Sequence, residues 1–124
     1  MGRTVLIVDD DVAVREGLRE FLEAEGYRTF SAAHGREALA VLEDEVPSLI
    51  LVDLEMPIMD GWKLLEALQC YQELAGIPIV LMTDGENLTS VTPSAPIYLK
   101  PLDLDHLASA IRRLRRNPPA ALAA

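Results

Sequence analysis

Two short runs of aliphatic residues in this chain each end in aspartate. Residues 5–8 are followed by Asp9-Asp10-Asp11, and residues 49–52 are followed by Asp53. Runs of Val, Ile and Leu without polar alternation are typical of strands buried on both faces, as in a parallel sheet covered by helices. Ligands of such sheets bind beyond the carboxyl ends of the strands. The pattern therefore predicts an α/β domain that gathers carboxylates at its binding edge.

The rest of the chain continues this alternation of strand and helix. We expect strands at residues 5–8, 28–32, 49–53, 79–82 and 97–99, with helices following the first, second, third and fifth of them. Asp11, Asp60 and Asp103 are suitable helix N-caps, and Gly26 is a suitable helix stop. A repeated strand-helix order predicts a doubly wound, five-stranded parallel sheet with right-handed crossovers.

One crossover and the C-terminal tail depart from this order. Residues 84–96 contain two prolines and little helical periodicity, so the fourth helix is expected to be short, at most residues 86–91, or missing. Residues 117–124 begin with Asn-Pro-Pro and continue almost entirely in alanine. We therefore predict one domain at residues 1–116, followed by a linker or disordered tail at 117–124.

Charge and composition restrict the partners of this domain. Eleven basic against 20 acidic residues give a net charge of −9, which argues against direct binding of nucleic acid or of anionic membranes. The single cysteine, Cys70, excludes an internal disulfide and suits a reducing cytoplasm. No apolar run approaches the ~20 residues of a membrane span. The expected location is therefore cytoplasmic.

The carboxylates at the strand ends call for a cation. Two carboxylates about 4 Å apart repel each other by roughly 4 kcal/mol at an effective dielectric constant of ~20. Asp9, Asp10 and Asp53 offer only oxygen ligands, a donor set that suits Mg²⁺. The sequence thus predicts a magnesium site.

Four strand ends present Asp9-Asp10, Asp53, Thr83 and Lys100 in order. Residues 53–61 read Asp-Leu-Glu-Met-Pro-Ile-Met-Asp-Gly, and Lys100 is followed by proline. Together these motifs resemble the receiver domain of bacterial response regulators, a CheY-like, flavodoxin-like fold. The resemblance covers residues 4–116.

The resemblance implies a site and its partners. Asp53 would be the phosphoacceptor, taking a phosphoryl group from a phosphohistidine on a sensor histidine kinase or phosphotransfer protein. Mg²⁺ would be held by Asp10, Asp53 and the backbone carbonyl of Glu55, with Asp9 acting through water. Lys100 and Thr83 would bind phosphoryl oxygens. The downstream protein is unknown, and the domain would catalyse only its own phosphorylation and dephosphorylation.

Some positions depart from the family's pattern. The residue after Thr83 is usually small, whereas Asp84 would crowd and repel a phosphoryl donor. Ile97 occupies the position of the usual aromatic switch, and the neighbouring Tyr98 is expected to point to the opposite face of the sheet.

These departures leave two alternatives to a phosphorylated receiver. One is an interaction module that works without phosphorylation, like a pseudo-receiver. The other is a Mg²⁺-dependent phosphohydrolase, although Asp53-Leu54-Glu55 lacks the second aspartate of Asp-x-Asp phosphatases and the chain has no room for a cap domain.

Overall fold

The computed structural model describes residues 4–56, 60–72, 74–85, 97–100 and 102–116. The described residues form a five-stranded parallel sheet in the order β2-β1-β3-β4-β5, together with four helices. The strands are β1 (Thr4–Val8), β2 (Arg28–Ala32), β3 (Leu49–Asp53), β4 (Ile79–Thr83) and β5 (Ile97–Leu99). The helices are α1 (Val12–Ala24), α2 (Gly35–Asp44), α3 (Gly61–Gln69) and α4 (Leu104–Arg116). The expected flavodoxin-like, doubly wound fold is confirmed.

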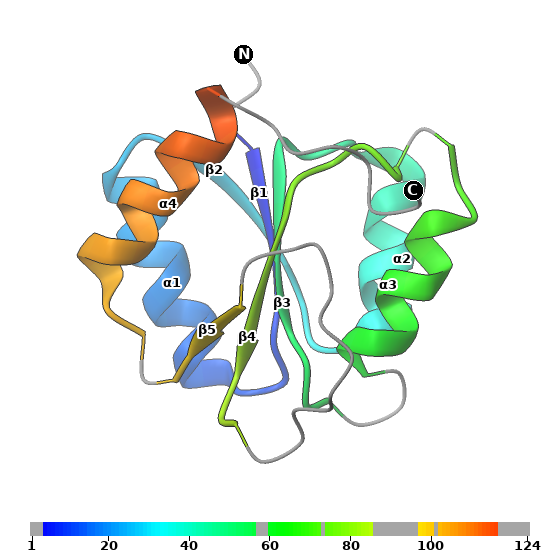
Figure 1. Ribbon diagram of the computed structural model, residues 1–124, viewed down its shortest axis with the longest axis horizontal. Coiled ribbons are helices and arrows are strands. Elements are labelled where there is room, and N and C mark those ends of the chain that lie inside the picture. Colours follow the sequence, from blue (N-terminus) through cyan, green and yellow to red (C-terminus); the bar gives the residue numbers. More distant parts are fainter. Residues whose placement is uncertain (1–3, 57–59, 73, 86–96, 101, 117–124) are drawn as a thin grey trace.

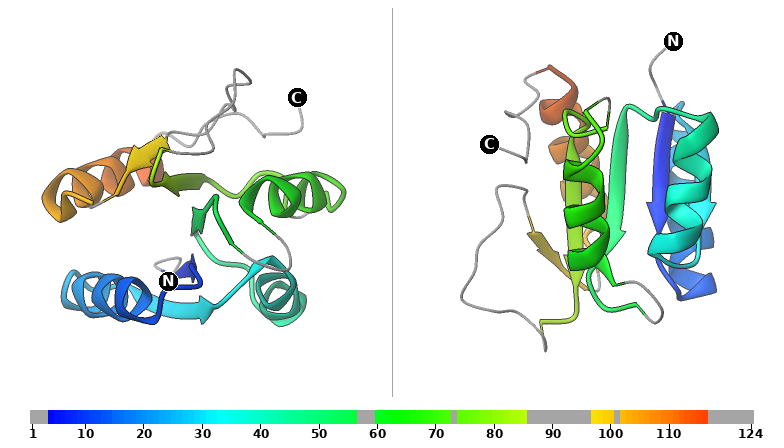
Figure 2. Two further views of the ribbon diagram at one scale, coloured as in Figure 1. Left: turned by 90° about the horizontal axis from the view of Figure 1, so that it is seen from below. Right: turned by 90° about the vertical axis from the view of Figure 1, so that its right-hand side faces the viewer.

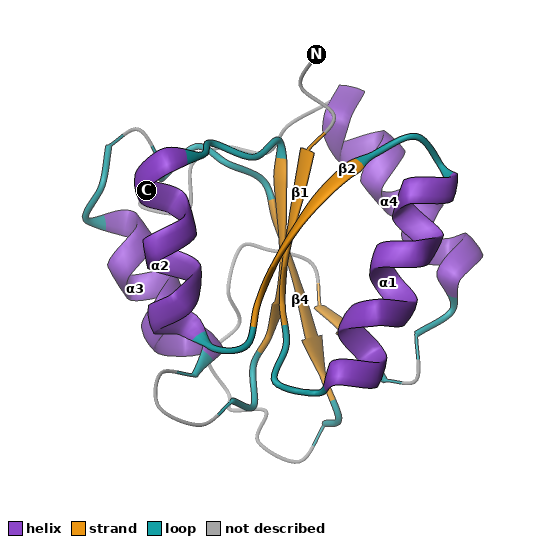
Figure 3. Cartoon of the chain, turned by 180° about the vertical axis from the view of Figure 1, so that it is seen from behind, coloured by secondary structure: helices purple, strands orange, loops and turns teal. Residues whose placement is uncertain are grey.

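Helices cover both faces of the sheet. Figures 1 and 3 show α1 and α4 on one face and α2 and α3 on the other, and Figure 2 shows the sheet between these two layers. None of the helices in the described ranges is long and apolar enough to cross a membrane.

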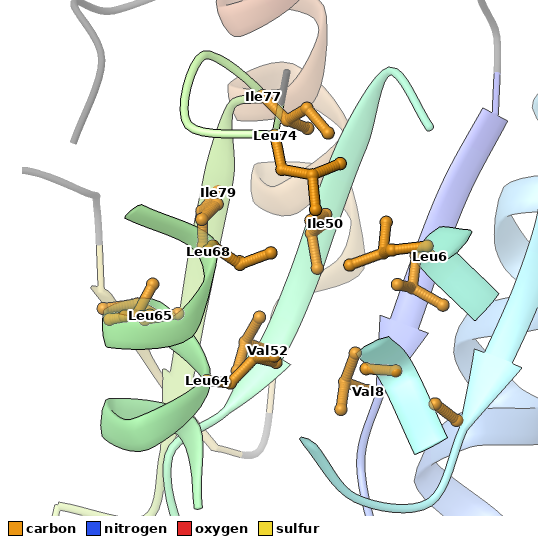
Figure 4. Close-up of a cluster of buried hydrophobic side chains, with 14 of the residues drawn as sticks. Leu6, Val8, Ile50, Val52, Leu64, Leu65, Leu68, Leu74, Ile77 and Ile79 are labelled. Carbon is orange, nitrogen blue, oxygen red and sulfur yellow. The ribbon is translucent and has the colours of Figure 1, made fainter. Parts of the chain in front are cut away.

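Each face of the sheet has its own hydrophobic core because successive strand residues point to opposite sides. In β1, Leu6 and Val8 join the core beneath α2 and α3, whereas Val5 and Ile7 join the core beneath α1 and α4. Figure 4 shows the first of these cores, where Leu6 and Val8 lie beside residues of β3, β4 and α3. Burial on both faces explains why the strands carry no polar alternation.

The predicted helix boundaries agree with the structure at several capping residues. Asp11 accepts hydrogen bonds from the N–H groups of Ala13 and Val14, and Asp60 caps α3. Asp103 accepts from the N–H of His106 at the start of α4. Gly26 has φ +95°, as a residue that ends a helix often does.

Two parts of the sequence prediction lie outside the described residues. The expected short helix at 86–91 falls within residues 86–96, and the expected tail occupies residues 117–124. The domain boundary at residue 116 therefore stays a prediction. His34 caps α2, because its Nδ1 accepts a hydrogen bond from the N–H of Glu37.

Candidate acidic site at the carboxyl end of the sheet

Strand register brings the predicted site residues to one edge. Val8 lies opposite Val52, Asp53 opposite Met82, and Thr83 opposite Leu99. The residues that end β1, β3, β4 and β5 are therefore neighbours although they are far apart in sequence. The backbone N–H of Lys100 donates to the carbonyl of Thr83 at 2.8 Å, which extends the β4–β5 pairing to the site.

Asp9, Asp10 and Asp53 form the acidic cluster expected from the sequence. Each offers one carboxylate oxygen, and these oxygens lie within 4.8 Å of one another. Asp9 and Asp53 are buried, whereas Asp10 is exposed. Three carboxylates converging from two strand ends match the hard oxygen donors that Mg²⁺ prefers. The donor set thus fits the predicted ion.

Lys100 lies between the two buried carboxylates. Its Nζ is 2.9 Å from Oδ2 of Asp9 and 3.2 Å from Oδ2 of Asp53. Burial lowers the pKa of Lys100, but the hydrogen bond and charge of Asp9, with those of Asp53, outweigh burial and hold this pKa above its usual value. The ammonium is therefore charged at neutral pH. The sequence predicted contacts to phosphoryl oxygens but not this bridge between carboxylates.

Asp53 resists ionisation. Burial raises its pKa to about 7, the charge of Asp9 acts in the same direction, and the N–H of Glu55 and the Lys100 ammonium oppose the shift. The Glu55 N–H donates to Asp53 Oδ1 at 3.1 Å. Burial and a like charge thus outweigh two favourable contacts.

This shift predicts a pH dependence for the metal-free protein. In the unfolded chain Asp53 loses its proton near pH 4, whereas in the folded protein it keeps the proton until about pH 7. The folded state then binds more protons between these values, so the contribution of Asp53 to the free energy of unfolding falls as pH rises through them. We expect a loss of roughly 1–3 kcal/mol.

Urea unfolding in EDTA between pH 4 and pH 8 measures this contribution when wild type is compared with Asp53→Asn. The variant should gain stability over wild type as pH rises. A constant difference over the whole range would show that Asp53 ionises as it does in an unfolded chain.

Thr83 also lies at this edge, but its hydroxyl is engaged by another side chain. Thr83 is fully buried, and its Oγ1 donates to Oε2 of Glu55 at 2.6 Å. The other carboxylate oxygen of Glu55 accepts from the N–H of Asp84 at 3.0 Å. The sequence assigned Glu55 only a backbone role. Its side chain reaches Thr83 because the chain turns directly after β3.

Gly61 allows that turn to pack closely. A Cβ at this position would lie 2.7 Å from the Asp53 carbonyl oxygen and 2.8 Å from the Leu54 Cα. Both atoms belong to the backbone and cannot yield as a flexible side chain would. Only glycine therefore fits at this position, whereas Pro57 and Pro101 lie outside the described residues.

Arg15 on α1 was not predicted to belong to this edge. Its Nη1 donates to the backbone carbonyl of Asp9 at 2.8 Å, so it ties the first helix to the acidic loop. The available signal was its position one turn into the helix that follows the aspartates. An arginine at such a position is equally often exposed to solvent. The sequence alone therefore does not predict its contact with the Asp9 carbonyl.

β5 contains Ile97, at the position where the family usually has its aromatic switch residue. Ile97 packs against the core beneath α2 and α3, whereas Tyr98 packs against the core beneath α1 and α4. The rings of Tyr98 and His106 meet edge to face, with centroids 5.4 Å apart. The expectation that Tyr98 points away from the face of Ile97 is confirmed.

Comparison with known proteins agrees with this fold. The family model for the response regulator receiver domain matches residues 5–112. The chain therefore belongs to the response regulator receiver domain family. Members of this family are phosphoacceptors of two-component signal transduction, and this is the function of the domain.

Two curated relatives illustrate the similarity. Sporulation initiation phosphotransferase F of Bacillus subtilis is 34% identical over 118 residues, covering 91% of this chain and 94% of that protein. Response regulator MprA of Mycolicibacterium vanbaalenii is 36% identical over 121 residues, which are 93% of this chain and 52% of that protein. Several other curated relatives are also about twice the length that the chain matches.

One solved relative was determined with Mg²⁺-BeF bound. The response regulator TrrA of Thermotoga maritima, in complex with Mg²⁺-BeF, has a TM-score of 0.80 and 29% sequence identity. The match covers 90% of this chain and 98% of that one.

Proposed function

We propose that Asp53 is the phosphoacceptor of this receiver domain. The observation that carries the assignment is the position of its carboxylate, 3.2 Å from the Lys100 ammonium and clustered with the carboxylates of Asp9 and Asp10, at the edge where parallel sheets bind ligands. In the reaction, a carboxylate oxygen of Asp53 forms a bond to phosphorus as the bond from phosphorus to the donor's imidazole nitrogen breaks. The products are an acyl phosphate and a free histidine.

The residues present would also hold Mg²⁺. We assign Asp10, Asp53 and the backbone carbonyl of Glu55 as direct ligands, and Asp9 as a ligand through water. Both Asp9 oxygens accept hydrogen bonds, one from the N–H of Asp11 and one from Lys100. When bound, the ion would neutralise charge on the carboxylates and on the transferring phosphoryl group.

Lys100 and Thr83 would stabilise the transferred group. The Lys100 ammonium lies 3.2 Å from Asp53 Oδ2, so a phosphoryl group attached to this carboxylate arrives beside a positive charge. The Thr83 hydroxyl would donate to another phosphoryl oxygen. For this it must leave the Glu55 carboxylate, its partner in the structure.

The phosphoryl donor would be a sensor histidine kinase or a phosphotransfer protein, as the names and family of the relatives suggest. The downstream protein stays open, because many relatives extend well beyond the matched length. We propose no turnover of external substrates, and a cytoplasmic location stays a prediction from the sequence.

Incubation with acetyl phosphate and Mg²⁺ tests the assignment. We expect the intact mass to rise by one phosphoryl group, and peptide mapping of the borohydride-reduced acyl phosphate should locate it at Asp53. A wild-type protein that stays unmodified would favour an interaction module that works without phosphorylation. Rapid release of phosphate without a detectable acyl phosphate would favour the phosphohydrolase alternative.

Mg²⁺ should raise the melting temperature, because it relieves repulsion within the acidic cluster and binds only the folded arrangement. At a concentration of 100 times Kd the expected gain is about 2.7 kcal/mol. Asp10→Asn should remove most of this gain, whereas Asp44→Asn, an exposed aspartate in α2, should keep it. An unchanged response in Asp10→Asn would place the ion elsewhere.

A further inference from the structure

The carboxylate of Glu55 holds the beginning of the loop after β4. Its two oxygens accept from the last residue of β4 and from the first residue of the loop, Oε2 from the Thr83 hydroxyl at 2.6 Å and Oε1 from the Asp84 N–H at 3.0 Å. The Glu55 N–H in turn donates to Oδ1 of Asp53 at 3.1 Å. One residue therefore connects the phosphoacceptor to the hydroxyl expected to bind the phosphoryl group.

The Thr83 hydroxyl cannot serve two acceptors at once. A hydroxyl has a single proton to donate, and here that proton goes to an ionisable carboxylate at short distance. Its oxygen also accepts from the N–H of Gly85 at 3.0 Å. The side chain is fully buried, so water cannot readily replace a lost partner. Donation to a phosphoryl oxygen thus requires that the contact with Glu55 be broken.

Gly85 allows the loop to close around this contact. Its φ of +91° is one that residues with a side chain rarely adopt, and its N–H donates to the Thr83 hydroxyl oxygen. The contacts with Glu55 and Gly85 together fix the hydroxyl in one orientation.

We propose that Glu55 is a positioning residue that opposes phosphorylation by holding the Thr83 hydroxyl on its own carboxylate. This inference rests on the proposed role of Asp53 and Thr83. The Glu55 carboxylate and a phosphoryl group on Asp53 compete for the same proton, and each contact excludes the other. Loss of the Glu55 side chain would therefore free Thr83 and favour the phosphorylated arrangement.

A double-mutant cycle isolates this competition. The probe is beryllofluoride with saturating Mg²⁺, the pair named for the Thermotoga relative, and the measurement is its Kd by calorimetry. Glu55→Ala should tighten binding about tenfold in the Thr83 background, because a charge-assisted hydrogen bond no longer holds the hydroxyl. In the Thr83→Ala background the same change should tighten binding about twofold or less, since only a negative charge is lost.

Two controls accompany the cycle. Glu45→Ala removes an exposed carboxylate after α2, at the other end of the sheet, and should leave Kd unchanged. Amide hydrogen exchange of Asp84, measured without any ligand, should speed up in Glu55→Ala because its acceptor is gone. This second readout does not depend on phosphorylation.

The outcomes separate this proposal from the assignment of the site. Equal tightening in both Thr83 backgrounds would show that Glu55 acts through charge alone, which overturns the proposal and leaves the site intact. Unchanged Asp84 exchange would show that the contact is not made. If neither wild type nor any variant binds beryllofluoride while Asp84 exchange responds, the proposed site fails and its regulation by Glu55 fails with it.

Discussion

Asp53→Asn is expected to abolish phosphorylation by acetyl phosphate in the presence of Mg²⁺. An amide carries no negative charge and is not a nucleophile, so no acyl phosphate can form at this position. Because asparagine has nearly the same size and shape as aspartate, the domain should stay folded. The substitution also removes a charge that is buried beside Asp9. The variant should therefore be at least as stable as wild type in EDTA at pH 8.

Intact-protein mass spectrometry measures this result. Asp44→Asn is the matched control, because it makes the same change at an exposed position of α2 and should be phosphorylated as wild type is. Phosphorylation that persists in Asp53→Asn would move the assignment to Asp9 or Asp10, which share the cluster.

Lys100→Met should strongly destabilise the domain. The ammonium neutralises two buried carboxylates, and its removal leaves Asp9 and Asp53 facing each other without a countercharge. Removing one partner of a buried ion pair costs about 3–5 kcal/mol, and we expect a loss of this size in EDTA at pH 8. Part of the loss should be recovered at pH 5, where Asp53 binds a proton, and part on addition of Mg²⁺.

The chain contains its own control for this change. Its second lysine, Lys63, is exposed on α3, and Lys63→Met should alter the free energy of unfolding by less than about 0.5 kcal/mol. Urea unfolding measures both variants. If Lys100→Met were as stable as Lys63→Met at pH 8, the bridge between the carboxylates would have no energetic role.

Much of the fold could be predicted because the strands are short aliphatic runs with clear ends. Parallel strands place those ends together, so the neighbourhood of Asp9, Asp53, Thr83 and Lys100 followed from the order of the elements. Helix caps such as Asp11 were also predictable, because a cap depends on residues only two or three positions away.

The remaining contacts depend on geometry that no local pattern contains. Glu55 and Thr83 are 28 residues apart, and their hydrogen bond exists because the turn after β3 directs a side chain across to β4. Lys100 was expected to meet a phosphoryl group, yet without one it lies between two carboxylates. That arrangement follows from the energy of buried charges rather than from spacing in the sequence.

The bridge formed by Lys100 would also set the valence of the cation that the proposed site accepts. With Asp53 ionised, three carboxylates and one ammonium leave a formal charge of −2. A monovalent cation would leave the cluster still anionic, whereas a divalent cation cancels its charge. The count of ionised groups would therefore disfavour sodium and potassium, before ligand geometry or ion radius contributes.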